Sequence, residues 1–402
     1  MSRKQEANLM TSINDIVWRI ILTKPFDSVR PIVTRSNSYR LEGQRQPSNS
    51  NFSTIILGGK ESVIYFSRLI YTTKPKTEIL GKRSYRNIAA SVKESKPDLA
   101  IIETKWLFSR FLHDNGFFVS PRVDFVLDIN GPLENIQEKM AYGKRRRIEK
   151  MAKTNWTFEI TKDPVKVQSF YHKMYLPHMF RRHGELAIPI SFSEYEKLLL
   201  QGYLLLVKKD QEYVSGKLLV HQGNELRSLI IGVGNTDTKL TSGSLAAWYY
   251  AIVLGIQKGY AKLDCGETPP FMLDGGFQYK REIGAQVRPA TGSSTQVFGM
   301  RFSKTSAPVR NFLSSNPFVF MDGTNLSGLI YLESLDNLHE SYCIPGLSGL
   351  YVVTSDFNRS NQRDFKLRQL SPKDLLNHKI RALGLFGEAC KAEGYSLYHL
   401  AL

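Results

Sequence analysis

The sequence predicts an α/β (α+β) fold with mixed sheets, and three observations predict it. Apolar strand-like runs alternate with helix-like segments from Pro97 onward, which is typical of layered α/β proteins rather than of helical bundles. Three strand-like runs with turn-sized gaps between them predict an antiparallel meander at residues 203–209, 212–220 and 225–233. A helix at 241–257 and a strand at 261–266 then complete a crossover unit, which makes two strands parallel.

The N-terminal part predicts further elements of both kinds. Residues 1–14 have the composition of a loose tail, and the polar stretch 35–51 is interpreted as a surface excursion. Apolar patterning predicts strands at residues 16–23, 53–57, 62–72, 98–103 and 124–129, and helices at 104–115 and 133–140.

Helix signals organise the rest of the chain. A basic linker helix is predicted at 141–152, a long helix at 164–182 behind the cap residue Asp163, and a shorter helix at 193–201. Beyond residue 290 several short strand-like runs lead to a helix that has Ser371 as its cap, Pro372 at its first position and Gly394 past its end. A last strand is expected at 395–402.

Composition favours anionic partners and an intracellular setting. Lys and Arg number 54 against 37 Asp and Glu, a net charge of +17, which suits nucleic acid, phosphorylated molecules or acidic membrane surfaces. The three cysteines have no C-x-x-C spacing, so we expect no disulfide framework, no metal site and a reducing cytoplasm. No apolar run approaches the roughly 20 residues that span a bilayer, so no transmembrane segment is expected.

The start of the helix at 241–257 is a candidate anion site. Ser242, Gly243 and Ser244 open an otherwise apolar helix, whose first-turn N–H groups lack partners and carry part of the positive end of the helix dipole. A phosphate would fit there. The alternative is that Ser and Thr are simply good N-cap residues.

Three segments in order carry a family resemblance. They are "KRRRIEKMAK", "FYHKMYLPHMFRRHGE" and "LDCGETPPFMLDGGFQYKREIGAQV", the last with Tyr279-Lys280 and Gly284 in a (Phe/Tyr)-Lys-x-x-x-Gly pattern. Together with the meander and the helix they resemble the Gcn5-related N-acetyltransferase (GNAT) superfamily, in its FemAB-like and CelD-like branch. The superfamily's usual loop, Arg/Gln-x-x-Gly-x-Gly/Ala, is replaced here by "KLTSGS".

The resemblance implies two tandem GNAT-like halves, a degenerate one at 1–140 and an acyltransferase half at 141–290, with an extension of unknown role at 291–402. It implies transfer of an acyl group, such as acetyl, from acyl-CoA to an amine by direct attack. The donor would be held by Ile231, Ser242, Gly243 and Ser244, and Lys280 would be functional. FemX-type relatives use aminoacyl-tRNA instead, which makes tRNA an alternative donor.

Chemistry is expected where the parallel strands splay beyond the helix start. Asp264 and Glu267 flank Gly266 at a strand end, where carboxylates can bind an ammonium group and accept its proton, and Lys280 would lie near the developing oxyanion. A surface turn is the alternative for the two carboxylates.

Two further groups are candidates for acceptor binding. His183 and Glu185 lie in one loop and can hold or deprotonate an amine, unless they only form a loop hydrogen-bond network. The resemblance implies that Arg145 or Arg146 faces an anionic substrate at the junction of the halves; the alternatives are that their helix is a solvated face or a nucleic-acid patch.

The sequence therefore predicts a cytoplasmic N-acyltransferase that uses acyl-CoA and no metal. The acceptor is a small amine, and amino sugars, amino acids, polyamines and cell-envelope precursors all remain open. An aminoacyl-tRNA-dependent transferase and a non-enzymatic nucleic-acid-binding protein are the alternatives.

Overall fold

The structure is a computed structural model. It describes residues 36–45, 50–105, 117–184, 187–234, 240–290, 296–302, 306–322, 324–333, 339–354, 368–369 and 396–401. Contacts divide the chain into two compact units, one of Met1–Phe118 with Thr295–Phe312 and one of Val119–Ser294 with Leu313–Leu402. Residues 313–402 thus share a compact unit with the second half. The division into three domains at 140 and 290 stays a prediction.

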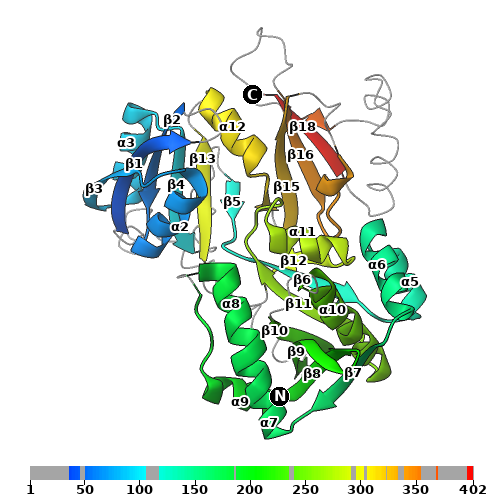
Figure 1. The fold of residues 1–402 in the computed structure, drawn as a ribbon. Helices are drawn as coiled ribbons and strands as arrows, with labels where there is room; N and C mark the ends of the chain where they lie inside the picture. Colours follow the sequence, from blue (N-terminus) through cyan, green and yellow to red (C-terminus); the bar gives the residue numbers. More distant parts are fainter. Residues whose placement is uncertain are drawn as a thin grey trace, which may run out of the picture. The chain divides into compact units, whose positions relative to one another are not determined.

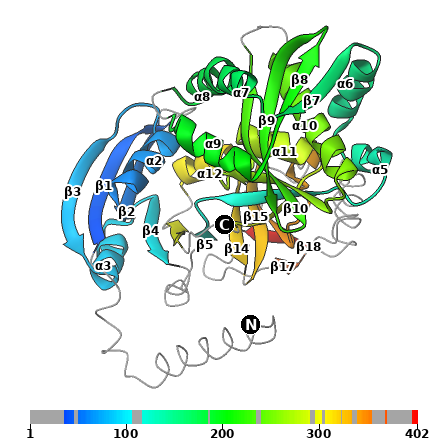
Figure 2. The same ribbon diagram turned by 90° about the horizontal axis from the view of Figure 1, so that it is seen from below.

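The first unit contains a five-strand arrangement in the order β3-β1-β2-β4-β13, with β3, β1 and β2 side by side in Figure 2. Only β2 and β4 pair in parallel, and the other neighbours are antiparallel. The elements are β1 (Ser36–Arg45), β2 (Ser50–Leu57), α2 (Lys60–Ile70), β3 (Lys76–Arg83), α3 (Tyr85–Ser95), β4 (Leu99–Lys105), β13 (Gln296–Phe302) and α12 (Ala307–Ser315).

Two expectations for this unit were wrong. Residues 62–72 form most of helix α2 rather than a strand, because Ser62, Phe66 and Ile70 repeat every four residues on its buried face. The stretch interpreted as a surface excursion contains strand β1. Its buried positions include Ser38 and Arg45, which donate to the carbonyls of Gly81 and Ile70, so a strand with a polar sequence is stable there.

Several predicted elements lie outside the described residues. They are the strand at 16–23, most of the helix at 104–115 and the helix with Ser371 as its cap. The strands expected at 53–57, 98–103 and 124–129 are confirmed as β2, β4 and β6 (Val123–Asp128), and the last strand as β18 (Ser396–Ala401).

The second unit is built on a seven-stranded mixed sheet in the order β12-β6-β11-β10-β9-β8-β7. The predicted meander is confirmed as β8 (Gly202–Lys209), β9 (Glu212–Gln222) and β10 (Glu225–Val233). Helix α10 (Leu240–Gln257) then crosses to β11 (Lys262–Thr268), which pairs in parallel with β10 as expected. The remaining strands of this sheet are β7 (Trp156–Thr161) and β12 (Gln286–Pro289), whereas β5 (Phe117–Val119) belongs to the other sheet.

Helices cover both faces of this sheet, as Figure 1 shows for α10 and α6 on one side and α8 on the other. The first group comprises α5 (Leu133–Glu138), α6 (Tyr142–Ala152), α10 and α11 (Gly275–Glu282). The second comprises α7 (Pro164–Phe170), a π-helical turn (Tyr171–Tyr175), α8 (Leu176–His183) and α9 (Phe192–Leu200). The predicted long helix at 164–182 is therefore present, with a π-helical turn inside it. Gly232 lies under that turn, where an added Cβ would come within 2.8 Å of the Tyr175 nitrogen.

A further group of strands belongs to the same unit. It comprises β14 (Phe318–Asp322), β15 (Asn325–Leu332), β16 (Gly349–Thr354), β17 (Arg368–Gln369) and β18, with a short helix at Glu340–Tyr342. Apolar side chains of β14, β15 and β16 join the core that contains those of β6, β11 and α10. With parallel and antiparallel pairs in the sheets and helices on both faces of the seven-stranded one, the predicted fold class is confirmed.

Candidate functional site

Strands β10 and β11 part soon after they begin to pair. Their parallel register covers only Glu225–Arg227 against Lys262–Asp264, although β10 continues to Val233 and β11 to Thr268. Each strand also shifts register at this level against its other neighbour, β10 between Ser228 and Ile230 and β11 between Asp264 and Gly266. The expected splay is confirmed. We call the opening between residues 228–233 and 265–268 the fork.

Lys280 of α11 lies at the fork. Its side chain is 9% exposed, and its ammonium group donates to the carbonyls of Gly266 (2.7 Å) and Glu267 (3.0 Å). These are carbonyls of β11 beyond its last pair with β10, so the lysine satisfies groups near the point where the ladder ends. An ammonium group has three donors, and no described residue accepts the third. Burial lowers the pKa of Lys280 to about 8.

A second lysine lies at the fork on β9. Lys217 is 1% exposed, its amine is 2.6 Å from the Ser228 hydroxyl oxygen, and it sits 3.2 Å from the centre of the Trp248 ring. Burial lowers the pKa of Lys217 well below its ordinary value of 10.5. The amine is therefore held between an aromatic face and a hydroxyl, away from water.

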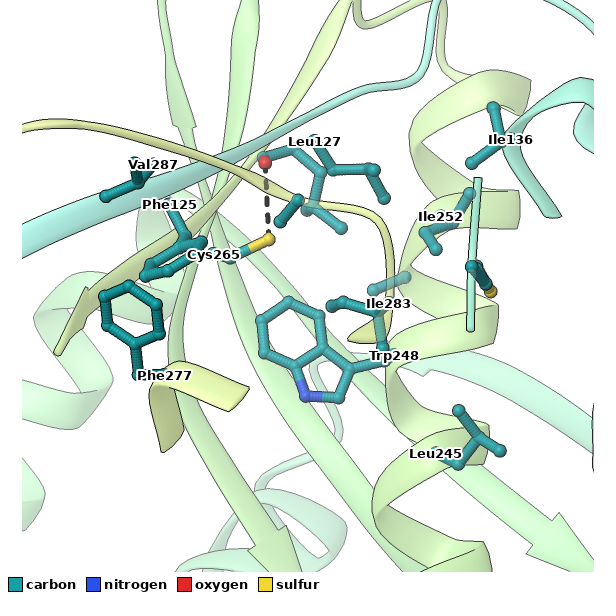
Figure 3. Close-up of a cluster of buried hydrophobic side chains, with 14 of the residues drawn as sticks. Phe125, Leu127, Ile136, Leu245, Trp248, Ile252, Cys265, Phe277, Ile283 and Val287 are labelled. Atoms are coloured by element: carbon teal, nitrogen blue, oxygen red, sulfur yellow. Dashed lines mark hydrogen bonds between the residues drawn. The ribbon is translucent and has the colours of Figure 1, made fainter. Parts of the chain in front are cut away.

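Cys265 of β11 feels both lysines electrostatically. Figure 3 shows it in the apolar cluster with Trp248, Phe125 and Phe277, its thiol directed at the Leu263 carbonyl. Burial raises the pKa of this thiol to about 12, and the two lysines oppose that rise only in part. Cys265 is thus a neutral thiol in the wall of the fork and not an activated nucleophile.

Helix α10 begins slightly earlier than expected. Its first residue is Leu240, so the first-turn N–H groups without a partner in the helix include those of Thr241 and Ser242. Gly243 packs against the sheet: an added Cβ would lie 3.4 Å from Val233, and its carbonyl accepts a hydrogen bond from Ser215. Binding of an anion at this helix start stays a prediction.

Basic side chains surround Tyr279, the residue before Lys280. Lys144 of α6 lies 3.9 Å from the Tyr279 ring centre and 3.3 Å from Glu282. Burial raises the pKa of Tyr279 to about 12, while Ser244 of α10, Arg147 and Arg182 act in the opposite direction. Tyr279 therefore connects the second turn of α10 with cations from α6 and α8.

Asp264 has contacts different from those expected. It is fully buried, and its carboxylate accepts a hydrogen bond from the Gly266 N–H (2.7 Å) and pairs with Arg288 (3.2 Å) and Arg227 (3.5 Å). Arg288 also forms a bidentate pair with Glu225 at 3.0 Å and lies 4.0 Å from Asp124. We call these five side chains the arginine–carboxylate network. Its contacts give Asp264 a structural task, and a role as general base stays a prediction.

The other predicted site residues are dispersed. Glu267 is exposed and reaches Lys280 only through its backbone carbonyl. Ile231 pairs with Lys217 across β9 and β10 and packs against the core. Arg146 is exposed and Arg145 half-buried on α6, and within the described residues neither contacts Lys280. His183 is the last residue of α8, and only its backbone is described. Glu185 lies outside the described residues.

Lys217 was missed at the level of sequence. The signal was its place in "VSGKLLV", a run that is apolar on both faces of a central strand, where a lysine side chain has no route to water.

No group of three or more His, Cys, Asp or Glu side chains in the part of the chain that the structure describes is arranged to hold a metal ion. Of the helices in the described ranges, none is long and apolar enough to cross a membrane.

Comparison with known proteins gives only structural similarity. No protein-family model matches the chain, and no curated protein matches it. Among solved structures, FemX shares 12% identity with a TM-score of 0.38, over 65% of this chain and 83% of FemX. L-PGS from Bacillus licheniformis shares 12% identity with a TM-score of 0.33, over 67% of this chain and 86% of that protein.

A third similar structure is a GCN5-related N-acetyltransferase from Sphaerobacter thermophilus. It shares 8% identity with a TM-score of 0.31, over 67% of this chain and 78% of that one. Fem and GCN5-related proteins are the groups that the sequence itself resembles. At these identities the likeness concerns the fold, and the chemistry has to rest on the side chains of the fork.

Proposed function

We propose that this protein is an N-acyltransferase that moves an acyl group from an activated donor to an amine by direct attack. The observation that carries the proposal is the fork: two parallel strands pair over three residues each and then part beside Lys280. Backbone N–H and C=O groups of β10 and β11 no longer meet each other there. An extended donor chain with amide groups can use them, which would bring its reactive carbonyl to the fork.

Lys280 supplies the electrostatic part of the reaction. Attack of an amine on an ester or thioester carbonyl places negative charge on the carbonyl oxygen. The ammonium of Lys280 is fixed by two backbone carbonyls and keeps one donor without an acceptor among the described residues. A donor that needs no reorganisation in a site shielded from water stabilises such an oxyanion strongly.

The donor we favour is acyl-CoA, with acetyl-CoA as the simplest form. Its phosphates would lie at the first turn of α10, near Arg182 of α8 and Arg147 of α6, which both act on Tyr279. Arg181 next to Arg182 donates to the carbonyl of Val233, which places the end of α8 at the end of β10. An aminoacyl-tRNA would present an ester and a phosphate chain to the same groups, and the net charge of +17 suits it.

The test is a thermal-shift and calorimetric screen with coenzyme A, acetyl-CoA, a long-chain acyl-CoA and tRNA. A ligand at 100 times its dissociation constant stabilises the fold by about 2.7 kcal/mol, which is readily resolved. We expect binding of the coenzyme A compounds, and release of free thiol from acetyl-CoA when an amine from a panel is added. Lys280→Met should bind the donor but lower kcat/KM by ~10²-fold or more, as for loss of one oxyanion donor.

Lys262→Met is the matched control, because this lysine lies at the start of β11 and its side chain is exposed. It should keep both binding and turnover. If tRNA binds and the coenzyme A compounds do not, the donor is an aminoacyl-tRNA. If none binds, or if Lys280→Met turns over at the wild-type rate, acyl transfer at the fork is wrong.

A further inference from the structure

Lys217 is a buried amine that no carboxylate of the described residues neutralises. The titratable groups that act on it are Cys265 of β11, which is a neutral thiol, and Lys280 of α11, which carries the same sign of charge. Its other contacts are Ser228 of β10 and Trp248 of α10. A lone buried ammonium group would cost several kcal/mol, and burial accordingly lowers the pKa of Lys217, which favours its neutral amine form.

The position of Ser228 connects this amine to the fork. Ser228 is the first residue of β10 after the last parallel pair, Arg227 with Asp264. A Cβ added to Gly266 on the opposite strand would lie 3.5 Å from the Ser228 carbonyl oxygen and 4.0 Å from the amine of Lys280. Ser228 and Gly266 thus face each other at the root of the fork, with Lys280 close to Gly266 and Lys217 bonded to Ser228.

The two lysines differ in their surroundings. Lys280 is held by two carbonyls, and Asp264 and Asp124 also favour its ammonium form while Arg182 opposes it, whereas Lys217 meets a hydroxyl and an aromatic ring. Burial lowers the pKa values of both lysines. Two titratable groups in such different environments are suited to act as acid and base in one site.

We propose that Lys217, acting through the hydroxyl of Ser228, accepts the proton that the acceptor amine releases during acyl transfer. The proposal rests on the proposed function and adds the base to it, for a thioester or an ester donor alike. Lys217 acts through another residue and is a positioning and proton-storing group, while Ser228 is the group that would meet the substrate.

The step balances in atoms and charge. The amine nitrogen bonds to the donor carbonyl carbon, and the carbonyl oxygen becomes an oxyanion beside Lys280. The nitrogen loses one proton to Oγ of Ser228, whose own proton moves to Nζ of Lys217. The C–S bond then breaks as the carbonyl reforms. The leaving thiolate takes up the proton stored on Lys217, through the hydroxyl of Ser228, so Lys217 returns to its neutral form.

The first experiment reads the protonation state without any substrate. In protein labelled with ¹⁵N at lysine Nζ, one resonance should have the shift of a neutral amine at pH 7 and be missing in Lys217→Met. Lys262→Met should retain it. If every lysine resonance of the wild type is an ammonium at pH 7, the proposal is overturned.

The second experiment uses acetyl-CoA with an arylamine acceptor, which stays unprotonated over the pH range of the assay. The wild-type kcat/KM should rise with pH as Lys217 loses its proton and fall above about pH 8 as Lys280 loses its own. Lys217→Met should lower kcat/KM by ~10²-fold or more and abolish the rise at low pH, with donor affinity unchanged. Ser228→Ala should also lower kcat/KM, while the neutral-amine resonance of Lys217 persists in this variant.

The outcomes separate this inference from the function on which it rests. If no donor binds the wild type, the proposed function fails, and the relay fails with it even though a neutral lysine is seen. If the donor binds and turns over but Lys217→Met keeps the low-pH rise and the wild-type rate, only the relay is wrong. A merely structural role of Lys217 would alter stability and leave the shape of the pH profile as it is.

Discussion

Two groups of ionisable side chains lie beside the strand pair β10 and β11 and are built in opposite ways. In the arginine–carboxylate network, Arg288 reaches Glu225, Asp264 and Asp124, and Arg227 adds a second cation to Asp264. At the fork, Lys217 and Lys280 form no ion pair in the described ranges; their hydrogen-bond and ring partners are a hydroxyl, aromatic rings and backbone carbonyls, and Asp264 and Asp124 act on Lys280 only at longer range. One group is directly paired in charge and the other is not.

The difference separates structural from functional burial. A compensated network ties β6, β10, β11 and β12 together, because β10 contributes two of its side chains and each of the other three strands contributes one. Uncompensated amines give the fold little that apolar side chains would not give better. Their retention at the point where two strands part is therefore best explained by chemistry that needs an amine there.

The strongest test of the comparison removes the central cation. Arg288→Met should destabilise the protein by about 3–5 kcal/mol, because Asp264 and Asp124 are fully buried and would lose a partner. Lys217→Met, measured in the same urea unfolding series, should be neutral or stabilising. Arg301→Met, at an exposed position on β13, is the control and should change little. Equal losses for Arg288→Met and Arg301→Met would break the comparison.

The second prediction sharpens it through pH. The folded pKa of Lys280 is about 8 against an ordinary value of 10.5, so below pH 8 both folded and unfolded chains carry this proton. Between pH 8 and 10.5 the unfolded chain binds more protons, so stability rises with pH, by about 3 kcal/mol in total for this group. Above 10.5 the contribution is constant.

The measurement is the free energy of unfolding in urea across this pH range. Lys280→Met should lack the rise that the wild type and Lys262→Met both show. Lys217, whose pKa is also lowered by burial, should add a rise of the same sign, and Lys217→Met should remove that part. Parallel curves for the wild type and both variants would mean that burial does not lower the pKa values of the two lysines.

The sequence allowed the frame of the site to be predicted, but not its charges. The meander, α10 and β11 follow from local apolar patterns and turn-sized gaps, and the splay followed once β10 and β11 were taken as parallel. Residues 62–72, most of which belong to helix α2, were wrongly predicted as a strand. Their sequence, "SVIYFSRLIYT", is rich in β-branched and aromatic residues, which also favour strands.

The roles of individual residues depend on partners far away in the chain. Asp264 was chosen by residue type, yet its environment is set by Arg227 and Arg288, which no local pattern connects to it. Lys217 was passed over because a charged residue in a strand is normally assigned to a solvent face. Only the packing of α10 through Trp248 removes it from water.

The smallest expected effect concerns charges that are neither paired nor deeply buried. On α6, Lys144 is bound to Glu282 and Tyr279, whereas Arg146 is exposed and Arg145 is half-buried. Exposed arginines contribute to polyanion binding mainly by releasing counterions, with a log–log salt slope of about 0.7–0.9 per phosphate contacted. The variant Arg145→Ala/Arg146→Ala should therefore reduce the salt slope for tRNA by about 1.4–1.8, with an unchanged free energy of unfolding. Lys197→Ala, at an exposed position on α9, is the control.

Duplex DNA of similar charge shows whether the binding is specific for RNA. Equal affinity for DNA and tRNA would make the basic excess a general electrostatic surface. It would remove both the tRNA-dependent enzyme and a dedicated RNA-binding protein. A slope that the double variant leaves unchanged would show that α6 takes no part in polyanion binding, so that the cations near Tyr279 act only on ligands of the fork.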